Sequence, residues 1–324
     1  MSLEPEVFQA AARAIEESDE IALACHVGPD GDALGSMLAL GLAARARGKK
    51  VVASFGSPHT VPPSLTFLPT DLLVPPTEFP DEPALMVVFD AGSPERLGEL
   101  ASNASKAKTV VVVDHHVTNQ GFGDVVVVDP RAAATGELVH RILKELGWEL
   151  TPDVATCLHT ALVTDTGRFS YANTTPGTLR IAAELVEAGA EPAVVGRHVY
   201  EEAPFGYLKA AAVALGRAEL DAGAQVVSTV ITEEDLDRSG IDWDDTENLI
   251  DLLRLTVEAD TAVLVKAHAD GRVKVSLRSR GNTDVGGLAA GMGGGGHRLA
   301  AGFTSEGDPE QVRRGVIAAV GDYR

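Results

Sequence analysis

The chain is poor in cysteine, in long apolar runs and in positive charge, and each shortage excludes a class of protein. Two cysteines in 324 residues cannot build a disulfide framework, which fits a reducing cytoplasm. No apolar run reaches the roughly 18 residues that a bilayer-spanning helix needs, so no membrane partner is expected. The N-terminal residues lack the basic and apolar segments of a secretion signal, so a cytoplasmic location is expected. A net charge of -20 repels long polyanions, so binding along extended duplex nucleic acid is not expected.

The first half of the sequence alternates short β-branched runs with helical segments. Strands are predicted at 21–25, 51–55, 85–89, 110–113 and 125–128, and helices at 33–47, 135–146, 152–163 and 178–188. Unbroken apolar runs between helices are typical of a parallel sheet covered on both faces, so the predicted fold class is α/β. The proline-rich stretch 57–83 is expected to be a long connection with little regular structure.

The second half has a different character, and at 324 residues two domains are expected. We predict a first domain over 1–190, a linker over 191–206 and a smaller mixed α/β domain over 207–324. A helix is expected at 205–220, followed by strands at 225–231, 261–268 and 272–279. The active site is expected in the cleft between the two domains.

Carboxylates and histidines follow the predicted strands of the first domain directly. The residues are His26, Asp30 and Asp32 after the first strand, Asp90 after the third, Asp114, His115 and His116 after the fourth, and Asp165 at the end of a helix. Ligands of such sheets bind beyond the carboxyl ends of the strands. Burying isolated carboxylates there costs several kcal/mol each unless something compensates. A pair of divalent cations compensates all of them at once, and mixed histidine and carboxylate ligands favour Mn²⁺ or a similar ion.

Each of these motifs has an ordinary structural alternative when it is taken alone. An Asp-x-Asp turn such as Asp30–Asp32 is most often a helix cap. His26 alone is more often a buried histidine with a satisfied hydrogen bond than a ligand. The adjacent histidines after Asp114 are more specific, because two imidazoles beside an acid at a strand end have little structural use. Together the motifs predict a metal centre.

The second domain carries a local excess of positive charge. Residues 251–300 hold seven Lys or Arg against five acids, a net +2 in a chain of -20, which points to a confined anion site. The strand at 272–280 alternates, so its basic residues share one face and its apolar residues the other. Arg272 and Lys274 are expected on a solvated face, whereas Arg278, Ser279 and Arg280 are candidate substrate-binding residues.

A glycine run near the end of the chain is the second candidate substrate-binding element. Gly294, Gly295 and Gly296 precede His297, but the run lacks the Gly-Lys-Ser/Thr ending of a P-loop. Glycines let a backbone approach a ligand closely and present N–H groups to an anion. His297 can stack on a base or bind a phosphate. A flexible turn is the alternative.

These motifs, in this order, resemble those of the DHH phosphoesterase family, which is named for the triplet found here at Asp114-His115-His116. The run Gly294-Gly295-Gly296-His297, followed by Ala300-Ala301-Gly302, resembles the signature of the DHH-associated C-terminal domain. The resemblance covers nearly the whole chain.

The resemblance implies a site with two divalent cations, Mn²⁺ preferred and Mg²⁺ or Co²⁺ possible. It implies that His26 and Asp30 hold one ion, that Asp32, His115 and Asp165 hold the other, and that Asp90 bridges both. Asp114 would orient an imidazole, and His116 would face the substrate phosphate, either as proton donor or as hydrogen-bond donor.

Within the family, the two-domain form is most similar to small oligoribonucleases. This implies hydrolysis of very short RNA, or of linear and cyclic dinucleotides such as pApA and c-di-AMP, to mononucleotides, and of adenosine 3′,5′-bisphosphate to AMP. A homodimer formed through the first domain is expected. The alternatives are a manganese-dependent inorganic pyrophosphatase, a single-strand DNA exonuclease, which normally has additional domains, and a non-catalytic nucleotide- or RNA-binding module.

Overall fold

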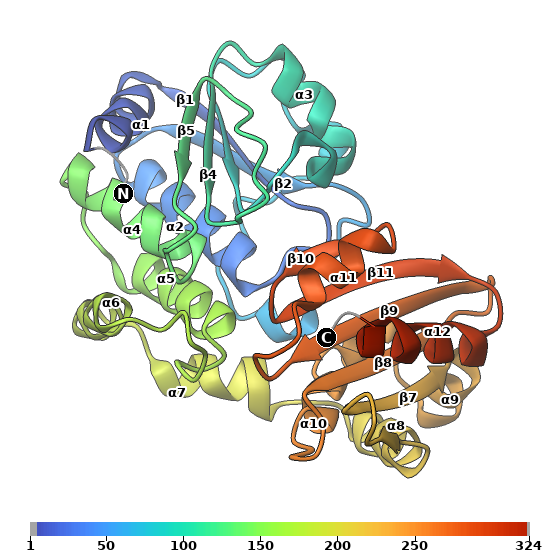
Figure 1. Ribbon diagram of the computed structural model, residues 1–324. Helices are drawn as coiled ribbons and strands as arrows, with labels where there is room; N and C mark the ends of the chain where they lie inside the picture. Colours follow the sequence, from blue (N-terminus) through green and yellow to red (C-terminus); the bar gives the residue numbers. More distant parts are fainter. Residues whose placement is uncertain (1–4, 323–324) are drawn as a thin grey trace. The chain divides into compact units, whose positions relative to one another are not determined.

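A computed structural model describes residues 5–322 and divides the chain into two compact units, Met1–Glu202 and Ala203–Arg324. The first unit is built on a five-stranded, fully parallel sheet with the strand order β2-β1-β3-β4-β5 (Figure 1). Its strands are β1 (Glu20–Cys25), β2 (Lys50–Phe55), β3 (Met86–Phe89), β4 (Val110–Asp114) and β5 (Val125–Val128). The predicted parallel sheet is confirmed.

Both faces of this sheet are buried, which explains why the interior positions of its strands are almost all apolar. In β1, Ile21 and Leu23 join the larger apolar core, whereas Ala22 and Ala24 join a smaller core on the opposite face. Successive side chains of a strand point to opposite faces, so an unbroken apolar run is needed to fill both. The larger core is covered by α1 (Pro5–Glu17), α2 (Gly31–Ala46), α4 (Thr135–Leu146) and α5 (Pro152–Asp165). The smaller core is covered by η3 (Pro94–Leu100) and α3 (Ala101–Lys106).

Helices α2 and α5 pack unusually closely, and small residues make this possible. A Cβ atom added to Gly35 would lie 2.4 Å from the carbonyl oxygen of Cys157, and one added to Gly31 would lie 2.5 Å from the Thr164 side chain. All residues from Gly31 to Ala44 are buried. The first turn of α2 therefore lies against the last turn of α5, which brings Asp32 toward Asp165.

The rest of the first unit consists of short helices and connections. Residues 57–83 contain only short 3₁₀ turns, η1 (Pro63–Leu65) and η2 (Pro76–Glu78), as expected from their prolines. After α5 follow α6 (Pro176–Glu187), α7 (Pro192–Gly196) and the π-helical turn η4 (Arg197–Glu201).

The second unit is a six-stranded mixed sheet with the order β10-β11-β9-β8-β7-β6. Its strands are β6 (Glu219–Asp221), β7 (Val226–Thr232), β8 (Thr261–Ala267), β9 (Arg272–Ser279), β10 (Gly295–His297) and β11 (Ala300–Glu306). Strands β7 and β8 run parallel, and the other neighbours run antiparallel. The predicted mixed α/β architecture of the second half is confirmed.

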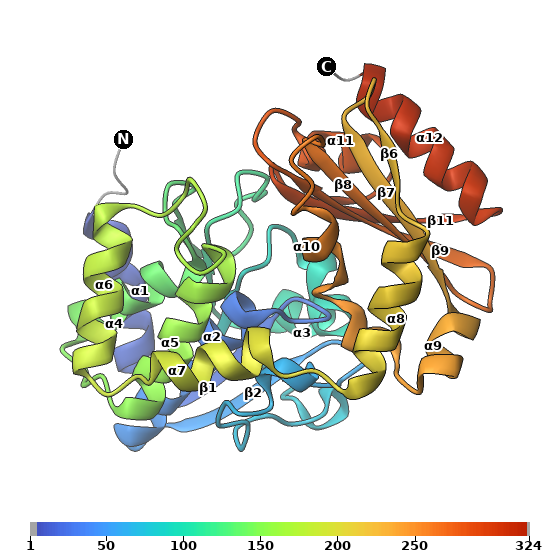
Figure 2. The same ribbon diagram turned by 90° about the horizontal axis from the view of Figure 1, so that it is seen from below.

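Helices cover both faces of this second sheet (Figure 2). One apolar core forms against α11 (Val285–Gly291) and α12 (Pro309–Asp322). The other forms against α8 (Phe205–Gly216), α9 (Glu233–Ser239) and α10 (Leu249–Leu253), with the 3₁₀ turn η5 (Trp243–Thr246) between them. None of the helices in residues 5–322 has the length and apolar character that a bilayer crossing requires.

The predicted helix over 205–220 is too long. Helix α8 ends at Gly216, and residues 219–221 form the edge strand β6 along β7. Glycine is a poor helix former, and the next residue, Arg217, directs its guanidinium to the buried carboxylate of Asp235, with contacts of 2.5 and 3.0 Å. The following backbone gains its hydrogen bonds from β7 instead of from a further helical turn.

The glycine run before His297 forms part of this sheet, and two of its glycines are required by packing. A Cβ on Gly294 would lie 2.2 Å from the carbonyl oxygen of Gly302, and one on Gly296 would lie 2.5 Å from that of Ala300. Gly296 also has φ of 138°, which side chains rarely adopt. Gly295, by contrast, has no atom within 4 Å of an added Cβ.

We therefore expect Gly296→Ala to lower the free energy of unfolding by about 2 kcal/mol or more, because it combines a strained backbone with overpacking. Gly295→Ala is the matched control and should change it by less than about 0.5 kcal/mol. Urea unfolding followed by circular dichroism measures both variants. Equal losses in the two would contradict a packing role for Gly296.

Candidate metal centre

The polar residues of the first unit meet at the carboxyl edge of the parallel sheet. Cys25 pairs in register with Phe89, and Phe89 with Val113. The residues that follow these aligned positions, His26, Asp90 and Asp114, therefore leave the sheet side by side. His26, Asp90, Asp114 and His115 are all at most 6% exposed.

Asp90 lies at the centre of this cluster. Its Oδ2 is 3.5 Å from Nε2 of His26, and its Oδ1 is 3.7 Å from Nε2 of His115 and 3.6 Å from Nδ1 of His116. Asp90 has φ of 55°, a left-handed conformation that is uncommon outside glycine and found at functional sites. Burial raises the pKa of Asp90, but the contact with His26 and the positive charge of the imidazoles outweigh it and hold the pKa below its usual range.

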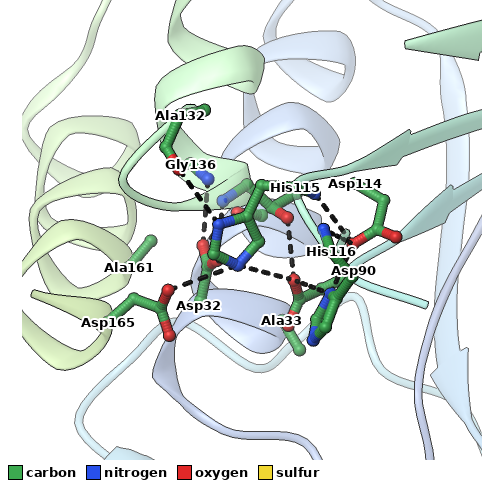
Figure 3. Close-up of polar contacts among 12 residues, drawn as sticks. Asp32, Ala33, Asp90, Asp114, His115, His116, Ala132, Gly136, Ala161 and Asp165 are labelled. Atoms are coloured by element: carbon green, nitrogen blue, oxygen red, sulfur yellow. Dashed lines mark hydrogen bonds and ion pairs between the residues drawn. The ribbon is translucent and has the colours of Figure 1, made fainter. Parts of the chain in front are cut away.

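His115 faces three carboxylates (Figure 3). Its Nε2 lies 3.2 Å from Oδ2 of Asp165, 3.6 Å from Oδ2 of Asp32 and 3.7 Å from Oδ1 of Asp90. On the other side of the ring, Nδ1 lies 3.2 Å from the carbonyl oxygen of Ala132 and must donate to it. Because Nδ1 donates to this carbonyl oxygen, Nε2 is the ring nitrogen that faces the carboxylates and that a cation would bind in place of a proton.

His26 repeats this arrangement. Its Nδ1 lies 3.0 Å from the carbonyl oxygen of Val27, and its Nε2 faces Asp90 and, at 3.9 Å, Oδ1 of Asp30. Asp30 also caps α2, since its Oδ1 accepts hydrogen bonds from the backbone N–H groups of Asp32 and Ala33. The helix-cap alternative for Asp30 is therefore realised, and it holds the carboxylate beside His26.

Asp32 is fully buried and contacts the beginning of α4. Its Oδ2 accepts from the N–H of Thr135 at 2.6 Å, and its Oδ1 accepts from the N–H of Gly136 at 2.9 Å and from the hydroxyl of Ser36 at 3.0 Å. The N-cap residue of α4, Ala134, has no side-chain oxygen. Asp32 thus satisfies the first N–H groups of α4 from a different helix.

Asp114 orients His116. Its Oδ1 accepts from Nδ1 of His116 at 2.6 Å and from the N–H of His115 at 2.8 Å. Its Oδ2 accepts from Nδ2 of Asn119 at 2.6 Å, and Asp114 itself is completely buried. The carboxylate therefore fixes the ring of His116, which is the more exposed of the two adjacent histidines.

Without a cation, the carboxylates of this cluster repel one another. Burial and then the charges of Asp90 and Asp165 raise the pKa of Asp32 well above its usual value. Burial, with the charges of Asp30 and Asp90, raises the pKa of Asp165 to about 7. Burial lowers the pKa of His115, but the charges of Asp165, Asp32 and Asp90 raise it to about 10. The site therefore attracts positive charge, whether protons or metal ions.

The donor set fits divalent cations. Ligand atoms lie within 4.8 Å of one another in three groups of the described residues of this unit: His26, Asp30 and Asp90; Asp32, Asp90 and His115; and Asp90, Asp114 and His116. Asp90 belongs to all three. Asp165, which contacts His115, adds a further carboxylate beside the second group. Imidazole nitrogen combined with carboxylate oxygen suits Mn²⁺ and similar ions.

The candidate residues of the second unit lie around the end of β9. Arg278 is half-buried, on the face opposite the apolar Leu277, and Arg280 is exposed with Nη1 2.9 Å from the carbonyl oxygen of Thr256. Ser279 is buried, and its hydroxyl lies 3.4 Å from Oδ2 of Asp260 and accepts from the N–H of Gly281. The Ser279 side chain therefore organises the loop after β9, whereas Arg278 and Arg280 remain candidates for substrate contact.

Sequence reasoning missed several residues that support the metal centre. Asn119 holds Asp114, Thr135 holds Asp32 and Asp90, and Asn173 donates to the carbonyl oxygens of Asp165 and Ala133. The pair Thr135-Gly136 at the start of a predicted helix could have indicated that the first backbone N–H groups of this helix bind another group. The local sequence around Asn173 contains no pattern that predicts its hydrogen bond to Asp165.

Comparison with known proteins places the chain in a family. The profile of the N-terminal domain of the DHH family matches residues 20–162, and that of the DHHA1 domain matches residues 223–322. The chain therefore belongs to the DHH family and carries both domains, which confirms the resemblance carried by the motifs.

Its relatives include the bifunctional oligoribonuclease and PAP phosphatase NrnA of Thermus thermophilus, 35% identical over 302 residues that cover 93% of this chain and 89% of the relative. The protein of the same name from Bacillus subtilis is 30% identical over 294 residues, 90% of each chain. A solved structure of an exopolyphosphatase-related protein from Bacteroides fragilis has a TM-score of 0.91 at 24% identity and covers 100% of this chain and 98% of that one, so the two share a fold.

A metal centre at this site predicts that Mn²⁺ stabilises the folded protein. At a free concentration about 100 times Kd, one bound ion adds about 2.7 kcal/mol. The melting temperature of the metal-stripped protein should therefore rise on addition of MnCl₂, and Asp90→Asn should remove most of the rise. The control is Asp71→Asn, an exposed carboxylate paired with Arg45, which should keep it in full. An unchanged melting temperature of the unsubstituted protein in excess MnCl₂ would rule the site out.

Proposed function

We propose that this chain is a divalent-metal-dependent phosphoesterase that hydrolyses very short oligoribonucleotides and linear or cyclic dinucleotides, such as pApA and c-di-AMP, to mononucleotides. The same site removes the 3′-phosphate from adenosine 3′,5′-bisphosphate. The observation that carries this proposal is the position of Asp90, whose two carboxylate oxygens face different histidines. A carboxylate in that position suits a pair of cations, the arrangement that phosphoryl-transfer chemistry uses repeatedly.

The residues divide into two sets around Asp90. His26 and Asp30 would hold one ion, Asp32, His115 and Asp165 the other, and Asp90 both. When bound, two divalent cations lower the pKa of water and neutralise charge on the phosphoryl oxygens. The mixture of imidazole and carboxylate donors favours Mn²⁺ over Mg²⁺, and Co²⁺ is a possible substitute.

His116 serves the leaving oxygen. Its Nδ1–H is held by Asp114, which is itself held by Asn119. This leaves Nε2 to provide a hydrogen to the oxygen that departs from phosphorus. The raised pKa of His116 fits a donor: burial lowers it, but the hydrogen bond to Asp114 and the charge of Asp90 outweigh burial.

The second unit offers a face on which a nucleotide can bind. His297 of β10 pairs with Ala300 of β11, and Ala300 pairs with Arg278 of β9, so the three side chains share one face of the sheet. Neighbouring strands lie about 4.8 Å apart, so the small side chain of Ala300 leaves a shallow space between the imidazole of His297 and the guanidinium of Arg278. The neighbouring pair Gly295 and Gly302 has no side chains, which makes this space wider. Such a surface suits a base stacked on His297 with its phosphate at Arg278.

The relatives support the choice of substrate class. The relatives from Thermus thermophilus and Bacillus subtilis are bifunctional oligoribonucleases and PAP phosphatases by name, and they match this chain over nearly its whole length. A net charge of -20 disfavours long nucleic acid, which agrees with a substrate of a few nucleotides. The cytoplasmic location and the homodimer through the first domain stay predictions.

Assays with a defined panel of substrates test the proposed activity. With Mn²⁺ we expect pApA to yield AMP, and adenosine 3′,5′-bisphosphate to yield AMP and phosphate, both resolved by mass spectrometry. Inorganic pyrophosphate and long RNA should be cleaved much more slowly, because neither presents a nucleotide of the right size to the second unit. If pyrophosphate were the fastest substrate, the protein would be a pyrophosphatase. If no substrate were turned over, the protein would be a non-catalytic binding module.

The role of the second unit is tested with His297→Ala. Loss of one base-stacking contact is worth about 1–3 kcal/mol, so KM for pApA should rise by about 5- to 150-fold. The KM for bis(p-nitrophenyl) phosphate, which lacks a base, should change little. Lys274→Ala is the matched control on the exposed part of β9 and should leave both values unaltered. Equal effects of His297→Ala on the two substrates would reject base recognition.

A further inference from the structure

Thr135 contacts two of the carboxylates in the cluster at once. Its hydroxyl donates to Oδ1 of Asp90 at 2.8 Å, and its backbone N–H donates to Oδ2 of Asp32 at 2.6 Å. Thr135 is completely buried and is the first residue of α4. It therefore ties the end of β3 to the first turn of α2 through two hydrogen bonds to charged oxygens, which are stronger than neutral ones.

The next residue makes this position rigid. The N–H of Gly136 donates to Oδ1 of Asp32 at 2.9 Å, a contact drawn as a dashed line in Figure 3. A Cβ on Gly136 would lie 2.6 Å from the Cβ of Ala161 in α5. The start of α4 is thus packed closely against α5, at a position where the hydroxyl of Thr135 reaches Asp90.

The hydroxyl of Thr135 determines how the Asp90 carboxylate is rotated. It binds Oδ1, the oxygen that faces His115, and thereby turns Oδ2 toward His26. A hydroxyl donor does not depend on the protonation of the histidines, so it would still hold Asp90 if both imidazoles bound cations. A carboxylate that is to hold two ions through its two oxygens needs one oxygen on each side.

We propose that Thr135 is the positioning residue of the metal centre, which holds Asp90 in its bridging orientation and links it to Asp32. This inference rests on the proposed two-metal function and concerns the affinity of the site, because hydrogen-bond partners of metal ligands commonly change metal affinity by 10–100-fold when they are removed.

The test is a Mn²⁺ titration of the full-length, metal-stripped protein, followed by the electron paramagnetic resonance signal of free Mn²⁺ and by calorimetry. Thr135→Val removes the hydroxyl and keeps the shape, and we expect at least one of two Mn²⁺ ions to bind tenfold or more weakly. Thr135→Ser restores the hydroxyl and should bind both ions with nearly the original affinity. The matched control is Thr160→Val, a buried threonine in α5 whose hydroxyl bonds only within its helix, to the carbonyl oxygen of Thr156.

If Thr135→Val does not fold, Thr135→Ala removes the same hydroxyl without adding bulk and gives the same measurement. Unchanged Mn²⁺ affinity in the variant that lacks the hydroxyl would overturn the inference while leaving the proposed function intact. Equal weakening in Thr135→Ser would overturn it as well, because shape and not the hydroxyl would then be responsible. Absence of Mn²⁺ binding in the unsubstituted protein would overturn the proposed function itself.

Discussion

The buried carboxylate of Asp90 is the interaction on which the polar interior of the first unit depends. It follows the central strand of the parallel sheet, in a left-handed conformation, and three imidazoles and one hydroxyl surround it. A buried carboxylate is tolerated only with compensating charge and hydrogen bonds. The imidazoles and the Thr135 hydroxyl supply part of that compensation, whereas Asp32 and Asp165 add negative charge that a cation would offset.

The parallel sheet is what brings these groups together. Parallel register aligns the ends of β1, β3 and β4, so residues separated by many tens of positions in the chain emerge at one edge. The close packing of α2 on α5 adds Asp32 and Asp165 from the helical layer. Because the strands are apolar on both faces, the polar residues at the ends of β1, β3 and β4 mark the site. This explains why the fold and the convergence of acids and histidines could be predicted from sequence.

Other parts of the molecule could not be predicted in this way, because they depend on contacts between distant elements. Asp32 of α2 accepts hydrogen bonds from the first backbone N–H groups of α4. Apart from the pair Thr135-Gly136, the sequence at the start of α4 does not predict this contact. The end of α8 is set by Arg217 reaching Asp235 and by the pairing of β6 with β7, neither of which is a local signal. The glycine run before His297 looked like a ligand-binding loop, yet Gly294 and Gly296 are small because neighbouring backbone leaves no space.

In the proposed metal centre, Asp90 would hold two cations at once. The most direct test is a crystal grown in the presence of MnCl₂, with diffraction data collected on both sides of the manganese absorption edge. We predict two anomalous peaks, one beside His26 and Asp30 and one beside Asp32, His115 and Asp165, each in contact with a different oxygen of Asp90. A single peak, or two peaks that Asp90 does not join, would contradict this role of Asp90.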